Sequence, residues 1–361
     1  MKVTTTNVFK NSEGIYLSHS CMNGLFYSEN IEAKKLEVIG RFANPSCDNA
    51  WYIVSTIQYN NDIYFFSCYA PEAWRLNEDN QLEKMIYSNE KTVELKAVIK
   101  YKNYAWVFPT YFSQNIIRIN LDTWKSEKIE WNIEKYLGID EQSFSEIVMI
   151  NNKVYFTNRI PNRIVMFEMD LETIEVRDRS LSKFNCIQSI MAEENTFWVL
   201  GRKKDGCIVL AHISYKDEVL KEFVFENEIS IIPENETMFI YPHIIKVDNK
   251  IILPPYRGSK MVIVDIEKEK VISLDDEVFE EIYSYYVEGE KVFLFSAKHP
   301  RIIIYNVTKN EYKKNDLQIL NEEKISILCN NVIKESLYVN ITDMIKELCM
   351  DKKGRENDEI K

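Results

Sequence analysis

Positively charged side chains gather in four short segments of this 361-residue sequence, and each segment lies between two apolar runs. The segments hold Arg159 and Arg163; Arg202, Lys203 and Lys204; Arg257 and Lys260; and Lys298, His299 and Arg301. The chain as a whole carries a formal net charge of −11, so such a grouping predicts a site for an anion. Arginine suits that role because its N–H fork matches carboxylate and phosphate groups.

Aromatic and polar residues occupy the corresponding segments of the first third of the chain. They are His19, then Tyr69 and Trp74, then Tyr111 and Phe112. Beside an anion site, such rings would stack on a sugar or base, or hold a peptide side chain. We expect Arg159, Arg202, Arg257 and Arg301 to contact the ligand or partner, with Trp74 and Tyr111 as apolar anchors.

Acidic segments favour a competing interpretation of the same charges. They are "ENEISIIPENE" (226–236), "DDEVFEE" (275–281) and "EKYLGIDEQSFSE" (134–146). If these segments share a face with the cations, the arginines and lysines pair with them, and the face is neutralised by its own residues. The acidic links also argue against a continuous basic stripe for nucleic acid.

A second chemistry is available to four residues on strands expected near a central axis. Tyr241 and His243 share one strand, and Tyr283 and Tyr285 share another. A histidine near tyrosine hydroxyls can act as an acid or base. The weak candidates for catalysis are therefore His243, Tyr241 and Tyr283, acting on a polar sugar-like or peptide-like substrate. The competing interpretation is a hydrogen-bonded core histidine.

Motifs for cofactors and metals are missing from the sequence. There is no phosphate-binding glycine loop and no G-x-S-x-G nucleophile elbow. The four histidines have no zinc-ligand spacing, and the seven cysteines are scattered without a C-x-x-C pair. We expect no cofactor and no metal.

These residues are positioned by a unit that the chain repeats. In "KVYFTNRIPNRIVMFEMDLETIEV" (153–176), three short strand-like runs are separated by polar turns. One anchor recurs in seven such stretches, at Tyr16, Tyr64, Trp106, Tyr155, Trp198, Ile252 and Phe293. A further strand-like run precedes each anchor, so the unit is A–B–C–D, four strands in about 46 residues. Such a period is typical of β-propeller blades, in which strand A lines the axis and the B–C turns share a face with the D–A connections.

The sequence predicts an all-β propeller of seven blades and leaves three questions open. A weaker eighth anchor, Tyr338, lies in a partial repeat (325–341), which indicates either an eighth blade or a closing strap. A β-sandwich with tandem meanders is the alternative fold. We expect one propeller domain over 1–341, followed by a short helix and charged tail over 342–361, or a docking peptide there.

The repeats resemble the kelch, NHL and WD40-like propeller superfamily over nearly the whole chain. The resemblance lies in period and strand pattern, with an apolar C strand followed by Asp or Asn and a turn, as in "IIRINLDT" and "IVMFEMDLET". The specific glycine, Gly-His and Trp-Asp signatures are missing. The resemblance therefore implies the fold and carries over no functional residue.

Composition narrows the function classes. No run approaches the roughly 18 apolar residues of a membrane span, and the first residues lack a signal-peptide core. We expect a cytoplasmic, bacterial, monomeric protein that binds neither nucleic acid nor membranes. The leading prediction is a non-catalytic binding or scaffolding propeller that docks a protein or a small anionic ligand on its B–C face. The alternative is a lyase or hydrolase with its site at the axial mouth.

Overall fold

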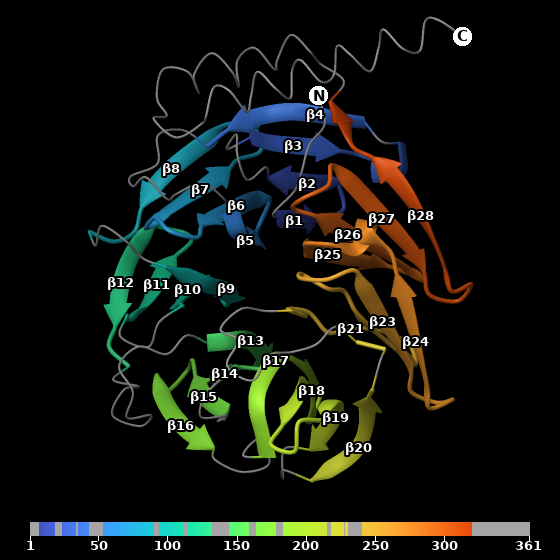
Figure 1. Cartoon of the computed structure of the whole chain (residues 1–361). Coiled ribbons are helices and arrows are strands. Elements are labelled where there is room, and N and C mark those ends of the chain that lie inside the picture. Colours follow the sequence, from blue (N-terminus) through green and yellow to red (C-terminus); the bar gives the residue numbers. More distant parts are fainter. Residues whose placement is uncertain are drawn as a thin grey trace, which may run out of the picture.

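A computed structural model of the chain describes most of the propeller region. The described residues are 7–18, 24–33, 35–42, 53–89, 94–110, 114–131, 144–158, 164–177, 183–214, 218–226, 228–229 and 240–319. Within them, seven antiparallel sheets surround a central axis (Figure 1), and each sheet is one blade of a β-propeller. The predicted all-β fold and the count of seven blades are confirmed.

Each blade consists of four strands that follow one another in the chain, from the axis to the rim. Blade 1 is β1 (Asn7–Lys10), β2 (Ile15–Ser18), β3 (Gly24–Ser28) and β4 (Lys35–Arg41), with η1 (Ile31–Ala33) before β4. Blade 2 is β5 (Ile53–Tyr59), β6 (Asp62–Ser67), β7 (Glu72–Leu76) and β8 (Leu82–Ile86). Blade 3 is β9 (Leu95–Tyr101), β10 (Tyr104–Pro109), β11 (Ile116–Asn120) and β12 (Lys125–Ile129). Blade 4 is β13 (Phe144–Ile150), β14 (Lys153–Asn158), β15 (Ile164–Glu168) and β16 (Thr173–Arg177).

The remaining blades follow the same order. Blade 5 is β17 (Phe184–Glu193), β18 (Thr196–Lys203), β19 (Ile208–Ser214) and β20 (Val219–Phe225). Blade 6 is β21 (Ile245–Val247), β22 (Lys250–Leu253), β23 (Lys260–Asp265) and β24 (Lys270–Asp275), followed by η3 (Glu277–Phe279). Blade 7 is β25 (Ile282–Glu288), β26 (Lys291–Ser296), β27 (Arg301–Asn306) and β28 (Glu311–Asp316), and the short strand β29 (Gln318–Ile319) follows it.

The hydrophobic core is divided among the gaps between blades. Seven clusters of buried side chains are present in the described part of the chain, and each joins two neighbouring blades, including the last and the first. All seven anchors of the sequence repeat lie on the second strand of a blade and are buried. A single blade has two apolar faces and can bury both only by packing against neighbouring blades. The burial of these faces therefore explains both the repeated sequence pattern and the closed ring of blades.

The aspartate that follows the third strand in two repeats links adjacent blades. Asp122 of blade 3 accepts a hydrogen bond from the Tyr59 hydroxyl of blade 2 at 2.6 Å. Asp170 of blade 4 accepts one from the Tyr101 hydroxyl of blade 3 at 2.9 Å. This motif in the C–D turns therefore has a structural role on the face opposite the B–C turns.

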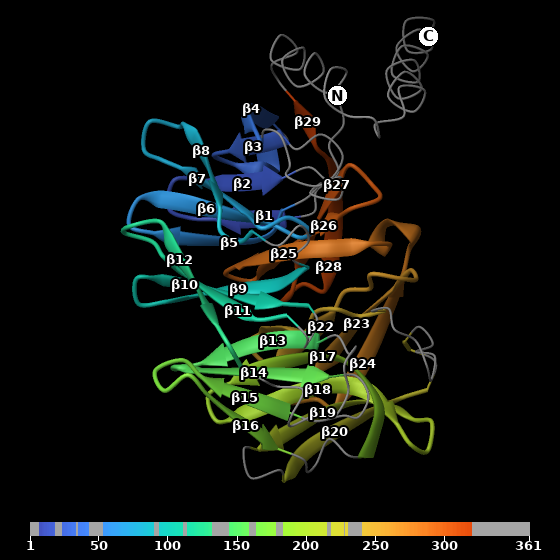
Figure 2. The ribbon, with the colours of Figure 1, turned by 90° about the vertical axis from the view of Figure 1, so that its left-hand side faces the viewer.

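The ring closes between blade 7 and blade 1 through charges and a short strand pairing. Lys291 and Lys313 of blade 7 each place Nζ 2.6 Å from the Glu32 carboxylate of blade 1. Beyond β28, β29 pairs in parallel with β4 at the rim of blade 1 (Figure 2). The chain therefore returns from the last blade to the first. The partial repeat at 325–341 and the helix predicted in 342–361 lie outside the described residues.

Replacing Glu32 by glutamine is expected to lower the free energy of unfolding by about 1 kcal/mol at neutral pH. Hydrogen bonds from Lys291, then Lys313, lower the pKa of Glu32 below the ordinary carboxyl value. The ionised group therefore stabilises the fold above the ordinary pKa, and this contribution is lost as the pH falls through the lowered pKa. Urea unfolding at pH 7 and pH 3 would test this, with Glu29→Gln as the matched control. Equal losses of unfolding free energy in Glu32→Gln and Glu29→Gln would contradict this prediction.

No helix within the described residues is long and apolar enough to cross a membrane.

Candidate functional site

Five of the seven axial strands carry a β-bulge near their first residues, on the face of the B–C turns. We call this side of the ring the B–C face. In β9 the pairing passes from Leu95 to Ala97, and in β25 from Ile282 to Ser284. A bulged residue has no paired residue on the neighbouring strand. The strict alternation of side chains between the two faces of the sheet is therefore interrupted at that residue. Bulges thus set which side chains reach the axial mouth.

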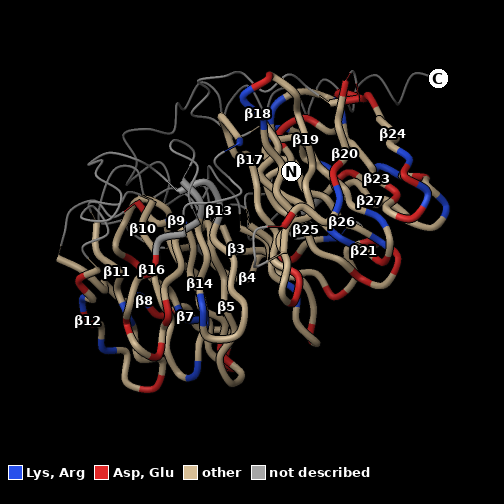
Figure 3. The backbone as a smooth tube through the Cα atoms, turned by 90° about the horizontal axis from the view of Figure 1, so that it is seen from below, with Lys and Arg blue, Asp and Glu red and all other residues tan. Residues whose placement is uncertain are grey.

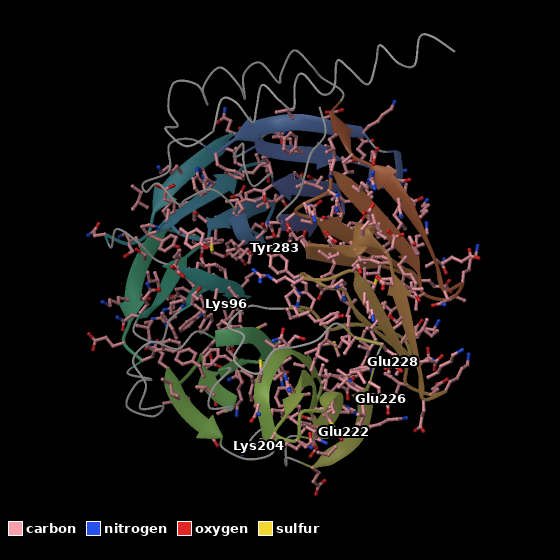
Figure 4. The ribbon with its side chains drawn as sticks, viewed as in Figure 1. Lys96, Lys204, Glu222, Glu226, Glu228 and Tyr283 are labelled. Carbon is pink, nitrogen blue, oxygen red and sulfur yellow. The ribbon has the colours of Figure 1, made fainter. Side chains whose placement is uncertain are left out.

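Lys96 and Tyr283 are the bulged residues of β9 and β25. Figure 4 shows both at the centre of the ring, from blades on opposite sides of it. The sequence analysis singled out Tyr283 but missed Lys96, which lies at the equivalent position of its repeat. An alignment of the repeats would identify Lys96, since Lys96 and Tyr283 each come directly after the first strand residue of their blade.

The His243 side chain contacts the backbone of Tyr283 and the ring of Tyr285. Its Nε2–H donates to the backbone oxygen of Tyr283 at 3.0 Å. Its ring meets the Tyr285 ring edge-on, with centroids 5.1 Å apart. His243 precedes β21, which begins at Ile245, so its placement on the axial strand in the sequence analysis was wrong. Residues 240–244, which lead into β21, bring it to the mouth.

The imidazole of His243 is neutral at physiological pH. Its pKa is lowered from 6.5 to about 4, with burial as the largest cause. The hydrogen bond to Tyr283 acts in the opposite direction, and the Lys96 cation contributes to the lowering. With the proton on Nε2, Nδ1 carries the lone pair and can accept a hydrogen bond. The mouth therefore presents an uncharged acceptor close to a lysine.

Gln188 holds the connection that carries His243. It is one of the two bulged residues of β17 and is fully buried. Its Oε1 accepts from the backbone N–H of Ile240 at 2.6 Å and from that of Tyr241 at 3.4 Å. The amide of one axial strand thus fixes the segment that enters the next blade.

Tyr256 and Arg257 extend this group along the B–C turn of blade 6. The Tyr256 ring meets the Tyr283 ring edge-on at 5.7 Å. Its backbone N–H donates to the carbonyl of Ile240 at 2.7 Å, which ties the turn to the connection carrying His243. Burial, then the Glu281 carboxylate, raises the pKa of Tyr256, and Arg257 acts in the opposite direction.

We refer to Lys96, His243, Tyr256, Tyr283 and Tyr285 as the axial cluster. Its members come from blades 3, 6 and 7 and combine one cation, a neutral imidazole and three phenol rings. Arg257 lies next to the cluster and is exposed, and its guanidinium forms no ion pair within the described ranges. This arrangement can attract an anion and pack rings against it.

Tyr241 does not belong to the axial cluster. Its side chain is fully buried, and its hydroxyl donates to the backbone oxygen of Lys260 at 2.9 Å. The sequence analysis grouped it with His243 by strand alternation, but both residues precede the strand. In the structure, Tyr241 packs between blades 5 and 6 instead.

Several cations of the B–C turns are paired with carboxylates of their own blades. Lys203 lies 2.6 Å from Glu222, and Arg301 lies 3.1 Å from Asp316. Lys298 pairs with Glu280, which belongs to the acidic segment 275–281. The interpretation of a self-neutralised face therefore holds for these three residues. Figure 3 likewise shows Lys and Arg interspersed with Asp and Glu along the described backbone.

The other predicted contact residues have different surroundings. Arg202 is the last residue but one of β18 and is partly buried, Lys260 begins β23, and His299 lies in the turn before β27. His299 Nε2 is shielded from solvent and accepts or donates no hydrogen bond within the described chain. Arg159, Arg163 and Tyr111 lie outside the described residues, as does His19.

Trp74 is a core residue and cannot serve as an exposed anchor. Strand β7 begins at Glu72, so Trp74 lies within the strand and not in the B–C turn where the sequence analysis placed it. Its side chain is 3% exposed and packs edge-on against Phe42 at 5.1 Å. The earlier start is accompanied by a buried Glu72 carboxylate that pairs with Lys84 at 2.8 Å.

No three His, Cys, Asp or Glu side chains among the described residues come close enough together to hold a metal ion. The cysteines that the structure describes, Cys68, Cys186 and Cys207, are free thiols.

Comparisons with known proteins identify the fold. No protein-family model matches the chain, and no curated protein matches its sequence. Among solved structures, a streptogramin B lyase has a TM-score of 0.61 at 11% identity, with 87% of this chain and 94% of that chain covered. The virginiamycin B lyase from Staphylococcus aureus has a TM-score of 0.58 at 12% identity, covering 82% and 95%. YCF48 bound to D1 peptide has a TM-score of 0.58 at 10% identity, covering 82% and 92%. Identities this low show a shared propeller fold and nothing about activity.

Proposed function

We propose that this chain is a binding propeller that holds a small anionic ligand, or an anionic group of a protein partner, on its B–C face. The observation that carries the proposal is the axial cluster, in which a lysine, a neutral imidazole and three tyrosine rings converge from three blades. Long-range attraction would come from Lys96 and Arg257. The rings would supply area for contact at low entropic cost.

The contact surface extends outward from the axial cluster in this proposal. Arg257 is the first cation beyond the rings, because it follows Tyr256 in the same turn. Arg202, Lys260 and His299 belong to the surrounding turns and are proposed as further contacts, and Arg159, Arg163 and Tyr111 are retained from the sequence. Lys203 and Arg301 already have carboxylate partners, so we assign them a weaker part.

The charge state of His243 favours binding over catalysis. A base with a pKa of about 4 accepts protons poorly at neutral pH, and its Nε2–H is already occupied by the Tyr283 carbonyl. The cluster is therefore suited to binding a ligand that donates a hydrogen bond to Nδ1 of His243. The similarity to YCF48, whose structure contains a D1 peptide, supports a protein partner as one form of the ligand.

A lyase or hydrolase is the second candidate, and the specific observation in its favour is the lone pair on Nδ1 of a fixed histidine at the mouth. The similar folds of streptogramin B lyase and virginiamycin B lyase are compatible with it. In this candidate, His243 removes a proton from a polar substrate and a tyrosine hydroxyl assists. Turnover that falls as the pH drops toward 4 would distinguish it from pure binding.

The proposal also takes the chain to act as a monomer in the bacterial cytoplasm. The free thiols Cys68, Cys186 and Cys207 support a reducing compartment.

The test is a capture experiment from the host with three immobilised baits: the unchanged protein, Lys96→Glu and Lys100→Glu. Lys100 lies on the same strand nearer the opposite face, so it is the matched control. We expect one protein, or one small anion identified by mass spectrometry, to be retained by the unchanged protein and by Lys100→Glu and lost from Lys96→Glu. A parallel Arg257→Glu bait should weaken retention. Equal retention by Lys96→Glu would refute the site.

A further inference from the structure

Glu281 places a carboxylate beside the axial cluster. It lies between η3 and β25, two residues before Tyr283, and it is partly exposed. Its backbone N–H donates to the carbonyl of Tyr256 at 3.0 Å. Within the described residues its side chain forms no ion pair, since the neighbouring Lys298 binds Glu280 instead. The carboxylate is therefore available to a ligand at the mouth.

The backbone of Glu281 is left-handed, with a φ of 54°. The ten other non-glycine residues with positive φ in the described part of the chain all lie in A–B or C–D turns, on the opposite face. Such a conformation is unfavourable for a residue with a Cβ. Two hydrogen bonds hold it here, the one to Tyr256 and one from the Ala297 N–H to the Glu281 carbonyl at 2.8 Å. Glu281 is thereby anchored to the turn that carries Tyr256 and Arg257.

Arg257 and Glu281 bring opposite charges to Tyr256, and within the described ranges they form no ion pair with each other. The pKa of Tyr256 is raised by burial as the largest cause and by the Glu281 carboxylate, and the Arg257 guanidinium lowers it. The axial cluster holds a similar combination, because Lys96 is a cation and Nδ1 of His243 is an acceptor. A simple anion would contact the two cations and leave both acceptors without a donor. A ligand that carries a carboxylate and an ammonium group could contact all four.

We propose that the axial cluster binds a free α-amino acid with a large apolar side chain, its carboxylate toward Arg257 and its ammonium group toward Glu281. Lys96 and Nδ1 of His243 are the second contacts of these two groups. The tyrosine rings of the cluster would contact the side chain, and phenol faces also attract an ammonium group. This ligand class rests on the proposed binding function of the same site, because the carboxylate is the anionic group that the cations attract.

The test measures dissociation constants by NMR titration for two pairs of probes. L-phenylalanine and L-leucine carry the ammonium group, whereas L-phenyllactate and L-2-hydroxyisocaproate have a hydroxyl group in its place. The variants are Glu281→Gln and, as the matched control, Glu290→Gln, an exposed residue in the A–B turn of the same blade. In the unchanged protein and in Glu290→Gln, we expect at least one amino acid to bind about tenfold more tightly than its hydroxy acid. In Glu281→Gln this preference should disappear while the hydroxy acids still bind.

Arg257→Gln gives an independent readout, because both kinds of probe carry a carboxylate. We expect it to weaken the binding of amino acids and hydroxy acids alike, and unchanged binding would overturn the proposal. A preference that persists in Glu281→Gln would overturn it as well, as would the absence of binding by all four probes.

A separate outcome distinguishes this proposal from the anion site on which it rests. Equal affinities of amino acids and hydroxy acids for the unchanged protein, with both lost in Lys96→Glu, would overturn the amino-acid ligand and leave the anion site standing. Binding of every probe by Lys96→Glu as tightly as by the unchanged protein would refute the anion site itself.

Discussion

Replacing Gln188 by leucine is expected to lower the free energy of unfolding by about 2–4 kcal/mol. The substitution removes the acceptor for the backbone N–H groups of Ile240 and Tyr241, and both groups are buried. No water reaches them, so the hydrogen bonds are lost without replacement. The measurement is urea unfolding at neutral pH.

The same variant should also change the axial cluster, because Gln188 acts through the segment that carries His243. In Gln188→Leu we expect the NMR signals of the His243 ring to shift and its pKa to rise from about 4 toward 6.5 as the segment loosens. Gln58→Leu is the matched control, since that side chain is partly exposed and its loss should cost less than about 0.5 kcal/mol. Equal stability of the two variants would show that Gln188 is not the support described above.

Acidification from pH 7 to pH 5 is expected to reduce the free energy of unfolding by about 2 kcal/mol through His243 alone. In the unfolded chain this histidine takes up a proton near pH 6.5, whereas in the folded chain it stays neutral down to about pH 4. The unfolded state therefore binds more protons in this window. The stabilisation that His243 contributes is present above its pKa in the unfolded chain, 6.5. It is lost as the pH falls toward its pKa in the folded chain, about 4.

His243→Gln isolates this contribution, because glutamine can still donate an N–H to the Tyr283 carbonyl but does not titrate. We expect its unfolding free energy to fall less than that of the unchanged protein between pH 7 and pH 5, by about 2 kcal/mol. In Lys96→Met the pKa of His243 should rise, since the lysine cation opposes protonation. Parallel pH dependences for the unchanged protein and His243→Gln would contradict the assignment of a buried neutral imidazole.

The sequence by itself determined the repeating framework. The seven anchors, from Tyr16 to Phe293, are large and apolar at one position of each unit, and every one of them lies buried on the second strand of a blade. This could be predicted because a blade must bury both faces, and because turns between short strands require polar residues at regular spacing.

The composition of the candidate site was decided by the tertiary structure. Lys96, Gln188 and Tyr283 occupy bulges, and a bulge shifts the alternation of side chains by one residue. Tyr283 was predicted and the repeat spacing marks Lys96, but a strict period-two pattern does not give the direction of these side chains. His243 reaches the mouth along a connection that Gln188 holds from another blade. Ion pairs such as Lys203–Glu222 and the burial of Trp74 likewise depend on how strand ends meet in space. Local patterns specify strands and turns, whereas the chemistry of the mouth depends on contacts between segments distant in sequence.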